Sequence, residues 1–478
     1  MDAVSLGSAR DPARDGSHKD PALPRVAVVG AGISGLGAAL RLHHCGLARV
    51  SLFEKEHCFG GHAHTVDVTL PGADGKPVTH GVDTGFLVYN ERTYPRLIRL
   101  FEELGTPTAA SDMSFSVQAP HGLDGRSGRL EWNGATLNTV FAQRRNLVSP
   151  TFWWMLREIL RFNRLATRLA EGGDGQALEQ PLGEFLAQHR FGVAFQQGYL
   201  LPMIGCIWSC PLEQMLQFPL ATLVRFCHNH GLLQVEGRPR WFTVRGGSRQ
   251  YVDAVVRQLP DARAATPVLG IQRHEDHVLI ISRDGAERFD AVVMACHAPQ
   301  ALRLLGAGAS TAERQWLGPL RTQTNLAVLH TDERLMPQAR KAWAAWNFER
   351  ADPQAPTASA ASSSNPPASV CLHYWINQLQ PVPFAQPVIV TLNPLREPSP
   401  QLTLGRFEWE HPVFDAQAIA AQRHLGELQG ASRTWFAGAW CGYGFHEDGL
   451  RAGMAAADGL IERLQAGGLH ASSQRRAA

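Results

Sequence analysis

A G-x-G-x-x-G pattern at Gly30, Gly32 and Gly35 is the segment of this chain best suited to phosphate binding. In such a pattern the first glycine permits a tight turn and the second lets the backbone approach a pyrophosphate. The third allows the next helix to pack closely on its strand. That helix is expected to begin at Ile33, just before Ser34, and would add free N–H groups. Glu54, about twenty residues on, is suited to ribose hydroxyl groups and would repel a 2′-phosphate, which disfavours NADP.

The alternative is a glycine-rich turn without a ligand, but later glycines favour a flavin dinucleotide. The pair Gly60-Gly61 lets backbone amides run along a second stretch of phosphate and flavin, and His62 and Thr65 follow it. Near the other end of the chain, Gly438-Ala439 precedes Gly449-Leu450 and an alanine-rich helix. A helix N-terminus there would suit the pyrimidine end of a flavin. The sequence therefore predicts FAD.

Acid–base groups stand directly before that last helix, at His446, Glu447 and Asp448. One of them could exchange a proton at the flavin ring, or the carboxylates could only cap the helix; the residue types leave both interpretations open. His62-x-His64 and His228-Asn229-His230 have ligand-like spacing, but no cysteine or acidic partner accompanies them at zinc spacing. We therefore predict no metal site.

Short apolar runs predict the elements that must hold these loops. Residues 26–29 and 50–53 are expected strands around a helix at 33–44, which makes a β-α-β unit. Another apolar strand is expected at 291–295, and residues 93–242 are expected to be mostly helical and rich in aromatics. With 478 residues, 44% of them hydrophobic, the chain is long enough for about two to four domain-sized units.

Composition excludes several classes of protein. The net charge of +2 gives no sign of a basic surface for nucleic acid. The sequence contains no apolar run of about 18 residues, so no transmembrane helix is predicted. The eight cysteines lack C-x-x-C spacing, and the polar start is not a secretory signal, so a cytoplasmic location is expected. Aromatic and arginine residues in 150–165 suit peripheral contact with the inner membrane face, although a helix packed within a substrate domain is the favoured interpretation.

From Arg25 to Leu460 the chain resembles the superfamily of FAD-dependent amine oxidases and carotenoid desaturases. Within it, the chain is similar to bacterial FAD oxidoreductases whose genes often lie beside cyclopropane-fatty-acid-synthase-type methyltransferases. Four stretches carry this narrower resemblance: Gly61-His62-Ala63-His64-Thr65, Leu329-His330-Thr331-Asp332, Thr391-Leu392-Asn393-Pro394 and Gly444-Phe445-His446-Glu447-Asp448-Gly449-Leu450.

The resemblance implies an α/β fold like that of amine oxidases. A discontinuous Rossmann-type FAD-binding domain would be interleaved with an α+β substrate domain that covers the flavin with an apolar tunnel. The FAD-binding domain would use residues 25–90, 240–305 and 430–465, and the substrate domain 91–239 and 306–429, with disordered tails at 1–24 and 466–478 and a flexible insert at 351–369.

The resemblance also places residues at the cofactor, which we expect to be held without a covalent bond. His62 stands where many relatives have arginine, and Ala439 where many have an acidic residue. Cys441 is not where relatives tether FAD. The residues expected to contact FAD are Gly30, Gly32, Ser34, Gly35, Glu54, Lys55, Gly61, His62, Thr65, Val268, Gly438, Ala439, Gly449 and Leu450.

The resemblance implies hydride transfer from a lipid acyl chain to flavin N5, giving desaturation or isomerisation. Amine oxidases of this fold commonly hold a water against N5 with a lysine. This chain has four lysines, and none lies in the strand-like segment 325–330. Two alternatives stay open: a flavin amine oxidase, and a non-catalytic FAD-binding accessory subunit of a lipid methyltransferase.

Overall fold

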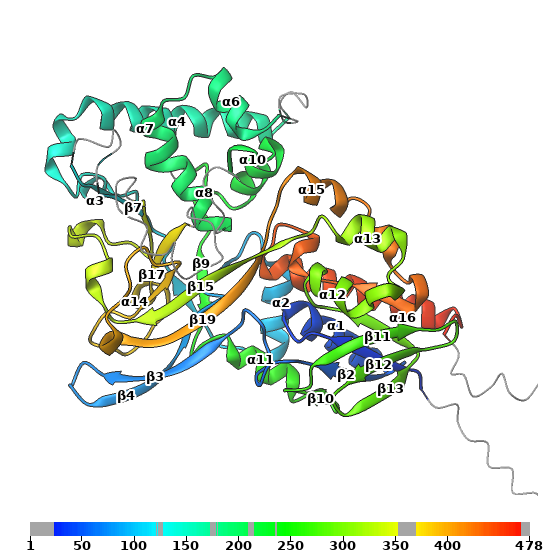
Figure 1. Cartoon of the computed structure of the whole chain (residues 1–478). Helices are drawn as coiled ribbons and strands as arrows, with labels where there is room; N and C mark the ends of the chain where they lie inside the picture. Colours follow the sequence, from blue (N-terminus) through cyan, green and yellow to red (C-terminus); the bar gives the residue numbers. More distant parts are fainter. Residues whose placement is uncertain are drawn as a thin grey trace, which may run out of the picture.

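The computed structural model describes residues 23–120, 122, 128–172, 178, 180–208, 215–234, 237–351 and 370–469. Most of the expected N-terminal tail, nearly all of the insert predicted at 351–369 and the end of the chain lie outside these residues. Two bodies are visible in Figure 1, one around the N-terminal strands and α16, the other around β15, β17 and α4.

A five-stranded parallel sheet forms the centre of the first body. Its order is β10-β2-β1-β14-β20, so strands from three distant parts of the sequence lie side by side. The strands are β1 (Arg25–Val29), β2 (Arg49–Phe53), β10 (Ala262–Arg263), β14 (Ala291–Met294) and β20 (Thr434–Phe436). Strand β14 is apolar and buried throughout, as expected for a strand covered on both faces.

Helices cover one face of this sheet and a β-meander the other. Val26 and Val28 pack toward α1 (Ile33–Cys45), α11 (Arg249–Val256) and α16 (His446–Gln465). Their neighbours in β1, Ala27 and Val29, pack toward the meander and α12. The elements on that side are β11 (Val268–Arg273), β12 (Val278–Ser282), β13 (Gly285–Phe289) and α12 (Ala298–Leu305).

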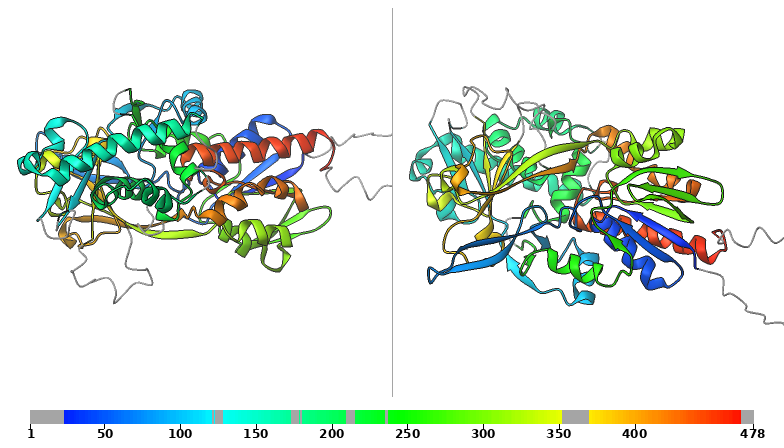
Figure 2. Two further views of the ribbon diagram at one scale, coloured as in Figure 1. Left: turned by 90° about the horizontal axis from the view of Figure 1, so that it is seen from above. Right: turned by 60° about the horizontal axis from the view of Figure 1, so that its bottom comes forward.

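The second body is built on a seven-stranded mixed sheet of order β19-β15-β18-β17-β16-β7-β8. Its strands are β7 (Phe115–Ala119), β8 (Leu130–Asn133), β15 (Thr322–His330), β16 (Trp346–Glu349), β17 (Cys371–Trp375), β18 (Ile389–Leu392) and β19 (Thr403–Pro412). A helical layer packs against it through one large apolar core (Figure 2). That layer contains α4 (Pro150–Ala170), α6 (Leu182–Gln188), α8 (Leu201–Trp208) and α10 (Leu220–Asn229).

The expectation that residues 93–242 are mostly helical is wrong for their first part. After α2 (Pro95–Leu104), this stretch contributes β6 (Thr108–Ser111), β7 and β8 before the helices begin. Strand β6 pairs with β9 (Trp241–Val244), which also pairs with β5 (Tyr89–Asn90). This small sheet joins the two bodies. Among the described residues, no helix has the length and hydropathy to cross a membrane.

Candidate functional site

A cavity of about 1960 Å³ lies where the two bodies meet. Its lining includes the glycine turn after β1 at one end and residues of α4, α8 and the seven-stranded sheet at the other. Of the predicted cofactor residues, those that line it are Gly30, Gly32, Ser34, Glu54, Lys55, Gly61, His62, Val268, Gly438 and Ala439. These ten predicted residues therefore lie together in the lining of one cavity, and their contact with FAD stays a prediction.

Two glycine segments meet at this end. Gly32 precedes α1 in an extended conformation, and a Cβ atom there would have no neighbour within 4 Å. The Gly60 amide donates to the Ala31 carbonyl at 2.9 Å. At Gly61, where φ is 58°, a Cβ would lie 3.1 Å from the Gly32 Cα. Open space beside Gly32, at the beginning of α1, is the geometry that a pyrophosphate requires.

Glu54 is buried beside the glycine turn. One of its carboxylate oxygens accepts the Ala31 N–H at 2.8 Å, and the other accepts the Glu56 N–H at 3.0 Å. Lys55 and Val268 line the same part of the cavity. Carboxylate, lysine and exposed backbone are suited to the ribose and adenine of a dinucleotide.

Four predicted cofactor residues are not in the lining of this cavity. A Cβ at Gly35 would lie 1.8 Å from the Gly30 carbonyl oxygen, so this glycine permits close helix–strand packing. Gly449 and Leu450 pack against α1. The Thr65 hydroxyl donates to the buried carboxylate of Asp83 at 2.6 Å. These residues support the site's walls in this structure, and their direct contact with FAD stays a prediction.

The three predicted acid–base residues separate into two roles. His446 lines the cavity, stacks on Phe86 at 3.8 Å between ring centroids, and its Nε2 lies 3.0 Å from the Tyr251 hydroxyl. Burial lowers the pKa of His446 to about 3, so the ring is neutral. The carboxylate of Glu447 instead accepts the backbone N–H of Leu97 at 3.0 Å, at the start of α2.

Asp448 caps its own helix. Its carboxylate accepts the Phe445 N–H at 3.2 Å and lies 3.0 Å from a guanidinium nitrogen of Arg451. Burial raises the pKa of this carboxyl to about 6. Neither Asp448 nor Glu447 lines the cavity, so of the three only His446 is placed to touch a ligand in this structure.

Three histidines that the sequence did not group together lie in the middle of the cavity. His62 comes from the second glycine segment, His297 follows β14, and His411 is on β19. The ring of His62 lies 5.2 Å from His411 and 6.4 Å from His297, between centroids. Burial lowers the pKa of all three below the usual value. The cluster is therefore neutral near pH 7.

A chain of amides fixes the tautomer of His411. Asn393 accepts the backbone N–H of Leu326 at 2.9 Å through Oδ1, so its Nδ2 is the donor that reaches Asn325 Oδ1 at 2.7 Å. Asn325 Nδ2 then lies 2.8 Å from His411 Nδ1. Because Asn325 is oriented as the donor, Nδ1 accepts and the neutral ring carries its proton on Nε2. His411 therefore offers one N–H donor at the cavity.

The part of the cavity within the second body is mostly apolar. Its walls come from α4, α8 and the seven-stranded sheet, and they include Leu156, Ile159, Met203, Ile207, Val390 and Leu392, with Trp132, Trp208, Trp346 and Tyr374. Within the described chain, Lys55 is the one lysine in the lining. It lies at the glycine end, so no described lysine reaches the apolar end.

The site fits FAD on features of this structure. Two glycine segments and the beginning of α1 surround open space, which suits a pyrophosphate. His62 Nε2 and His297 Nδ1 are buried without a hydrogen-bond partner among the described residues. Unpaired buried polar atoms of this kind are costly unless a ligand or water completes them. A polar ring system bound between them would supply the missing partners.

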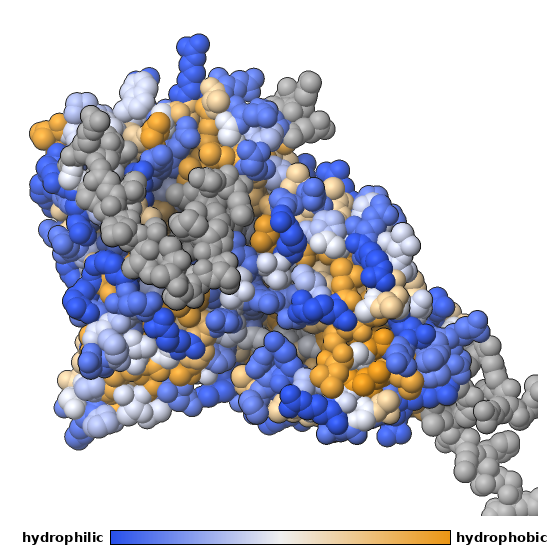
Figure 3. Space-filling view, viewed as in Figure 1, coloured by the Kyte–Doolittle hydropathy of each residue, from blue (hydrophilic) through white to orange (hydrophobic). Residues whose placement is uncertain are grey.

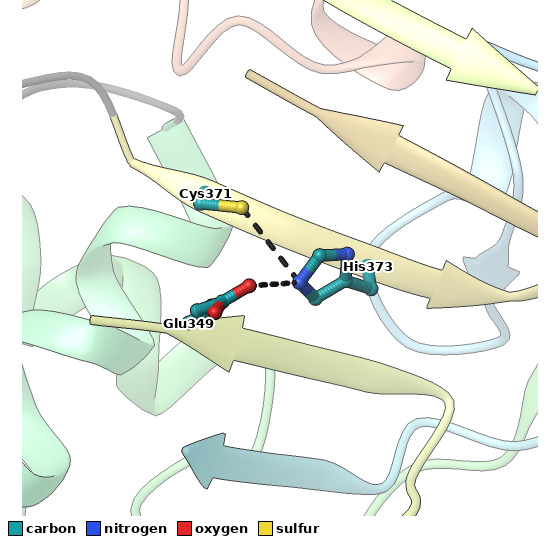
Figure 4. A group of neighbouring side chains, drawn as sticks. All are labelled: Glu349, Cys371 and His373. Carbon is teal, nitrogen blue, oxygen red and sulfur yellow. Dashed lines mark hydrogen bonds and ion pairs between the residues drawn. The ribbon is translucent and has the colours of Figure 1, made fainter. Parts of the chain in front are cut away.

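A separate group of side chains has zinc-ligand types. Glu349, Cys371 and His373 point toward one another from β16 and β17 (Figure 4). His373 Nε2 lies 2.9 Å from Glu349 and 3.7 Å from the Cys371 sulfur. Burial raises the pKa of the Cys371 thiol well above its usual value, which opposes the thiolate that zinc requires.

The same group is already hydrogen bonded to its surroundings. Arg396 donates to the second Glu349 oxygen at 3.0 Å, and Thr391 lies 2.8 Å from His373 Nδ1. His330 Nε2 also lies 2.7 Å from the Thr391 hydroxyl. We therefore interpret this group as a buried hydrogen-bond network between neighbouring strands of the seven-stranded sheet. The absence of a metal site stays a prediction.

Comparison with known proteins identifies the class. The family model for flavin-containing amine oxidoreductases matches residues 33–461. The chain belongs to this family, and FAD as cofactor and oxidoreductase as class follow from that membership.

Two curated relatives are similar over part of their length. (S)-6-hydroxynicotine oxidase of Paenarthrobacter nicotinovorans is 28% identical over 262 residues, which are 54% of this chain and 56% of that protein. Carotenoid phi-ring synthase of Streptomyces griseus is 26% identical over 315 residues, 61% of this chain and 56% of that protein. The chain thus spans little more than half the length of each.

Solved structures confirm the predicted fold class. A fatty acid isomerase from P. acnes that produces CLA superposes with a TM-score of 0.62 at 15% identity, covering 92% of this chain and 98% of that one. Putrescine oxidase bound to putrescine gives 0.61 at 16% identity, covering 92% and 99%. At such identities the likeness concerns the fold alone, and the two proteins act on different compounds.

Proposed function

We propose that this flavoprotein dehydrogenates or isomerises the acyl chain of a lipid. The observation that supports this most is the wall of the cavity's second end, which is mostly aliphatic and aromatic and belongs to the same cavity as the glycine end. An acyl chain buries its methylene groups against such a wall, at about 0.8 kcal/mol for each group. FAD, when bound, supplies a hydride acceptor.

The chain's own residues would exclude water and position the ligand. The apolar walls keep the second end dry, which favours a defined orientation of a flexible chain. The Nε2–H of His411 and the neutral ring of His446 would supply polar contacts at the junction of the two ends. Since His446 has a pKa of about 3, it is better suited to hydrogen bonding than to carrying a proton at pH 7.

Amine oxidation is the second candidate. It is favoured by the similarity to (S)-6-hydroxynicotine oxidase. One observation is against it. Amine oxidases of this fold commonly place a lysine beside the flavin, and no described lysine of this chain reaches the apolar end of the cavity.

Anaerobic spectroscopy of the yellow protein separates these candidates. We expect an acyl lipid, presented in detergent micelles, either to bleach the flavin absorption band or to be recovered as an isomer with a shifted double bond. Putrescine and monoamines should leave the band unchanged. Bleaching by an amine, with neither bleaching nor a double-bond shift from any acyl lipid, would overturn the proposal.

A lipid methyltransferase partner also belongs to this proposal, and its support is the narrower family resemblance. Pull-down with the methyltransferase, followed by its assay with and without this chain, tests it. An effect on methylation from a Gly32→Val variant that lacks FAD would favour an accessory role over turnover.

A further inference from the structure

Exposed apolar side chains are concentrated on one short part of the second body. Twelve large hydrophobic residues of the described chain are exposed, and six of them fall within residues 137–160, which we call the 137–160 patch. They are Leu137 (80% exposed), Leu147 (47%), Val148 (84%), Trp153 (50%), Trp154 (54%) and Leu160 (47%). In Figure 3 hydrophobic residues reach the surface at the upper left, where Figure 1 places α3 (Leu137–Val140) and the beginning of α4.

Arginine predominates among the charged residues in and beside this patch. Residues 137–170 contain six arginines and one acidic residue, Glu158. Glu158 is buried and accepts the backbone N–H of Gly192 at 2.9 Å. Across the described residues none of the six arginines makes an ion pair; Arg164, for example, donates to the Leu160 carbonyl. Within the described residues, the stretch that carries the patch therefore has six arginines without an acidic partner.

The patch also reaches the apolar end of the cavity. Leu137, Trp153 and Leu160 are exposed and at the same time line the cavity. Trp153 is held in place, since its Nε1 donates to the Leu147 carbonyl at 2.9 Å and its ring lies 5.2 Å from Phe141. An exposed but fixed tryptophan at such an opening is typical of a contact with an interface between water and lipid.

We propose that the 137–160 patch seats this protein on a bilayer containing anionic lipid, so that an acyl chain enters the cavity from the bilayer. Tryptophan, leucine and valine would enter the boundary of head groups and acyl chains, and the arginines would meet lipid phosphates. A second copy of this chain is a poorer occupant, because a two-fold contact would bring six unpaired arginines against six more. The entry of substrate rests on the function proposed above, but the docking does not.

Sedimentation with vesicles tests the docking. We expect the FAD-loaded protein to bind vesicles of phosphatidylglycerol and phosphatidylcholine, and to bind phosphatidylcholine alone far more weakly. Raising the salt from about 0.1 M to about 1 M shortens the Debye length from about 10 Å to about 3 Å, so the binding should fall. Arg157→Gln and Arg164→Gln should each weaken binding by about fivefold. Neither residue lines the cavity.

The apolar part has its own variant and a matched control. Val148→Ser combined with Trp154→Ser removes two exposed side chains that do not line the cavity, and vesicle binding should drop by more than tenfold. Leu269→Ser changes a residue of similar exposure, 58%, in β11 of the first body, and it should bind as the parent does. Flavin content and melting temperature should stay at the parent's values in all of these variants.

Several results would overturn the docking: a parent that does not bind anionic vesicles, patch variants that bind as the parent does, or a patch-dependent dimer in gel filtration without vesicle binding. Substrate entry is tested by a separate measurement, the rate of flavin reduction. Patch variants should keep the parent's rate of flavin reduction with a short-chain acyl compound in solution and lose rate only with vesicle lipid. If vesicles bind but no acyl compound reduces the flavin or is isomerised, the docking stands and the function proposed above fails.

Discussion

Gly32→Ala is a sharp test of the cofactor site, because its effects on folding and on binding separate. Gly32 has φ −68° and ψ 178°, which any residue can adopt, and the added Cβ would meet no atom within 4 Å. An alanine in place of glycine limits the unfolded chain, which stabilises by about 0.4–1 kcal/mol, but it is a poorer N-cap. The unfolding free energy of the cofactor-free protein should therefore change by less than about 1 kcal/mol.

Cofactor binding should respond differently. The methyl group would stand in the open space at the beginning of α1, where a phosphate must come close to backbone N–H groups. Loss of one hydrogen bond to a charged group costs about 1.5–3 kcal/mol, so the Kd for FAD should rise about tenfold to a hundredfold. Fluorescence titration of the apoprotein with FAD measures this, and the bulkier Gly32→Val should purify colourless.

Two controls define the outcome. Gly308→Ala adds a Cβ that also meets nothing within 4 Å but lies outside the cavity, so the FAD affinity should match the parent's, and the melting temperature should be equal or slightly higher. At Gly35 the added Cβ would lie 1.8 Å from the Gly30 carbonyl oxygen, and Gly35→Ala should not fold. A parental Kd for FAD in Gly32→Ala would show that the pyrophosphate does not lie beside this residue.

Three further predictions concern other parts of the chain. Glu349 pairs with Cys371 across β16 and β17, so replacing residues 351–369 with a short Gly-Ser bridge should leave flavin content and melting temperature nearly unchanged; a large fall in either would assign that stretch a structural role. Burial raises the pKa of Asp448 from 3.8 to about 6, so the folded state holds this proton more tightly than the unfolded state does. Protonation of Asp448 therefore stabilises the folded state at low pH, and this stabilisation is lost as the pH rises from about 4 through about 6. The unfolding free energy of the parent, relative to Asp448→Asn, should fall by about 1–3 kcal/mol over that range, and a constant difference would contradict the burial argument. His446→Ala should slow substrate-driven flavin reduction, whereas Glu447→Gln should cost only about 0.5–2 kcal/mol of stability through the weakened cap on α2; equal rates in stopped-flow measurements of the two variants would remove His446 from the site.

The glycine end of the cavity was predictable because its requirements are local. A turn with φ of 101° at Gly30 and close helix packing at Gly35 each demand glycine whatever surrounds them. Strands β7 and β8 were missed for the opposite reason. Their buried faces carry polar residues whose partners are remote: Ser116 donates to Asn347 at 2.7 Å, and Glu131 accepts the backbone N–H of Gln338 at 2.9 Å. Apolar and polar residues do alternate in both strands, but runs of four or five residues are too short for this pattern to decide between strand and helix without those partners.

The histidine cluster shows which part of a site needs the tertiary fold. His62, His297 and His411 come from three segments that meet only when β14 joins the parallel sheet and β19 crosses to the cavity. One local signal was present, since Phe407, Trp409 and His411 alternate along β19 and so share a face.

Asn393 explains why a stretch remote from the glycine turns belongs to the same site. Its φ of 47° lies in the left-handed region, which asparagine tolerates better than most residues. In that conformation its side chain takes the Leu326 N–H and orients Asn325, which in turn fixes the tautomer of His411. Aspartate at position 393 could accept the same N–H but could not donate to Asn325, so the amide is required by its two-sided chemistry. The motif around Asn393 thus acts on the cavity through the tautomer of one neutral ring, which neither spacing nor composition could have revealed.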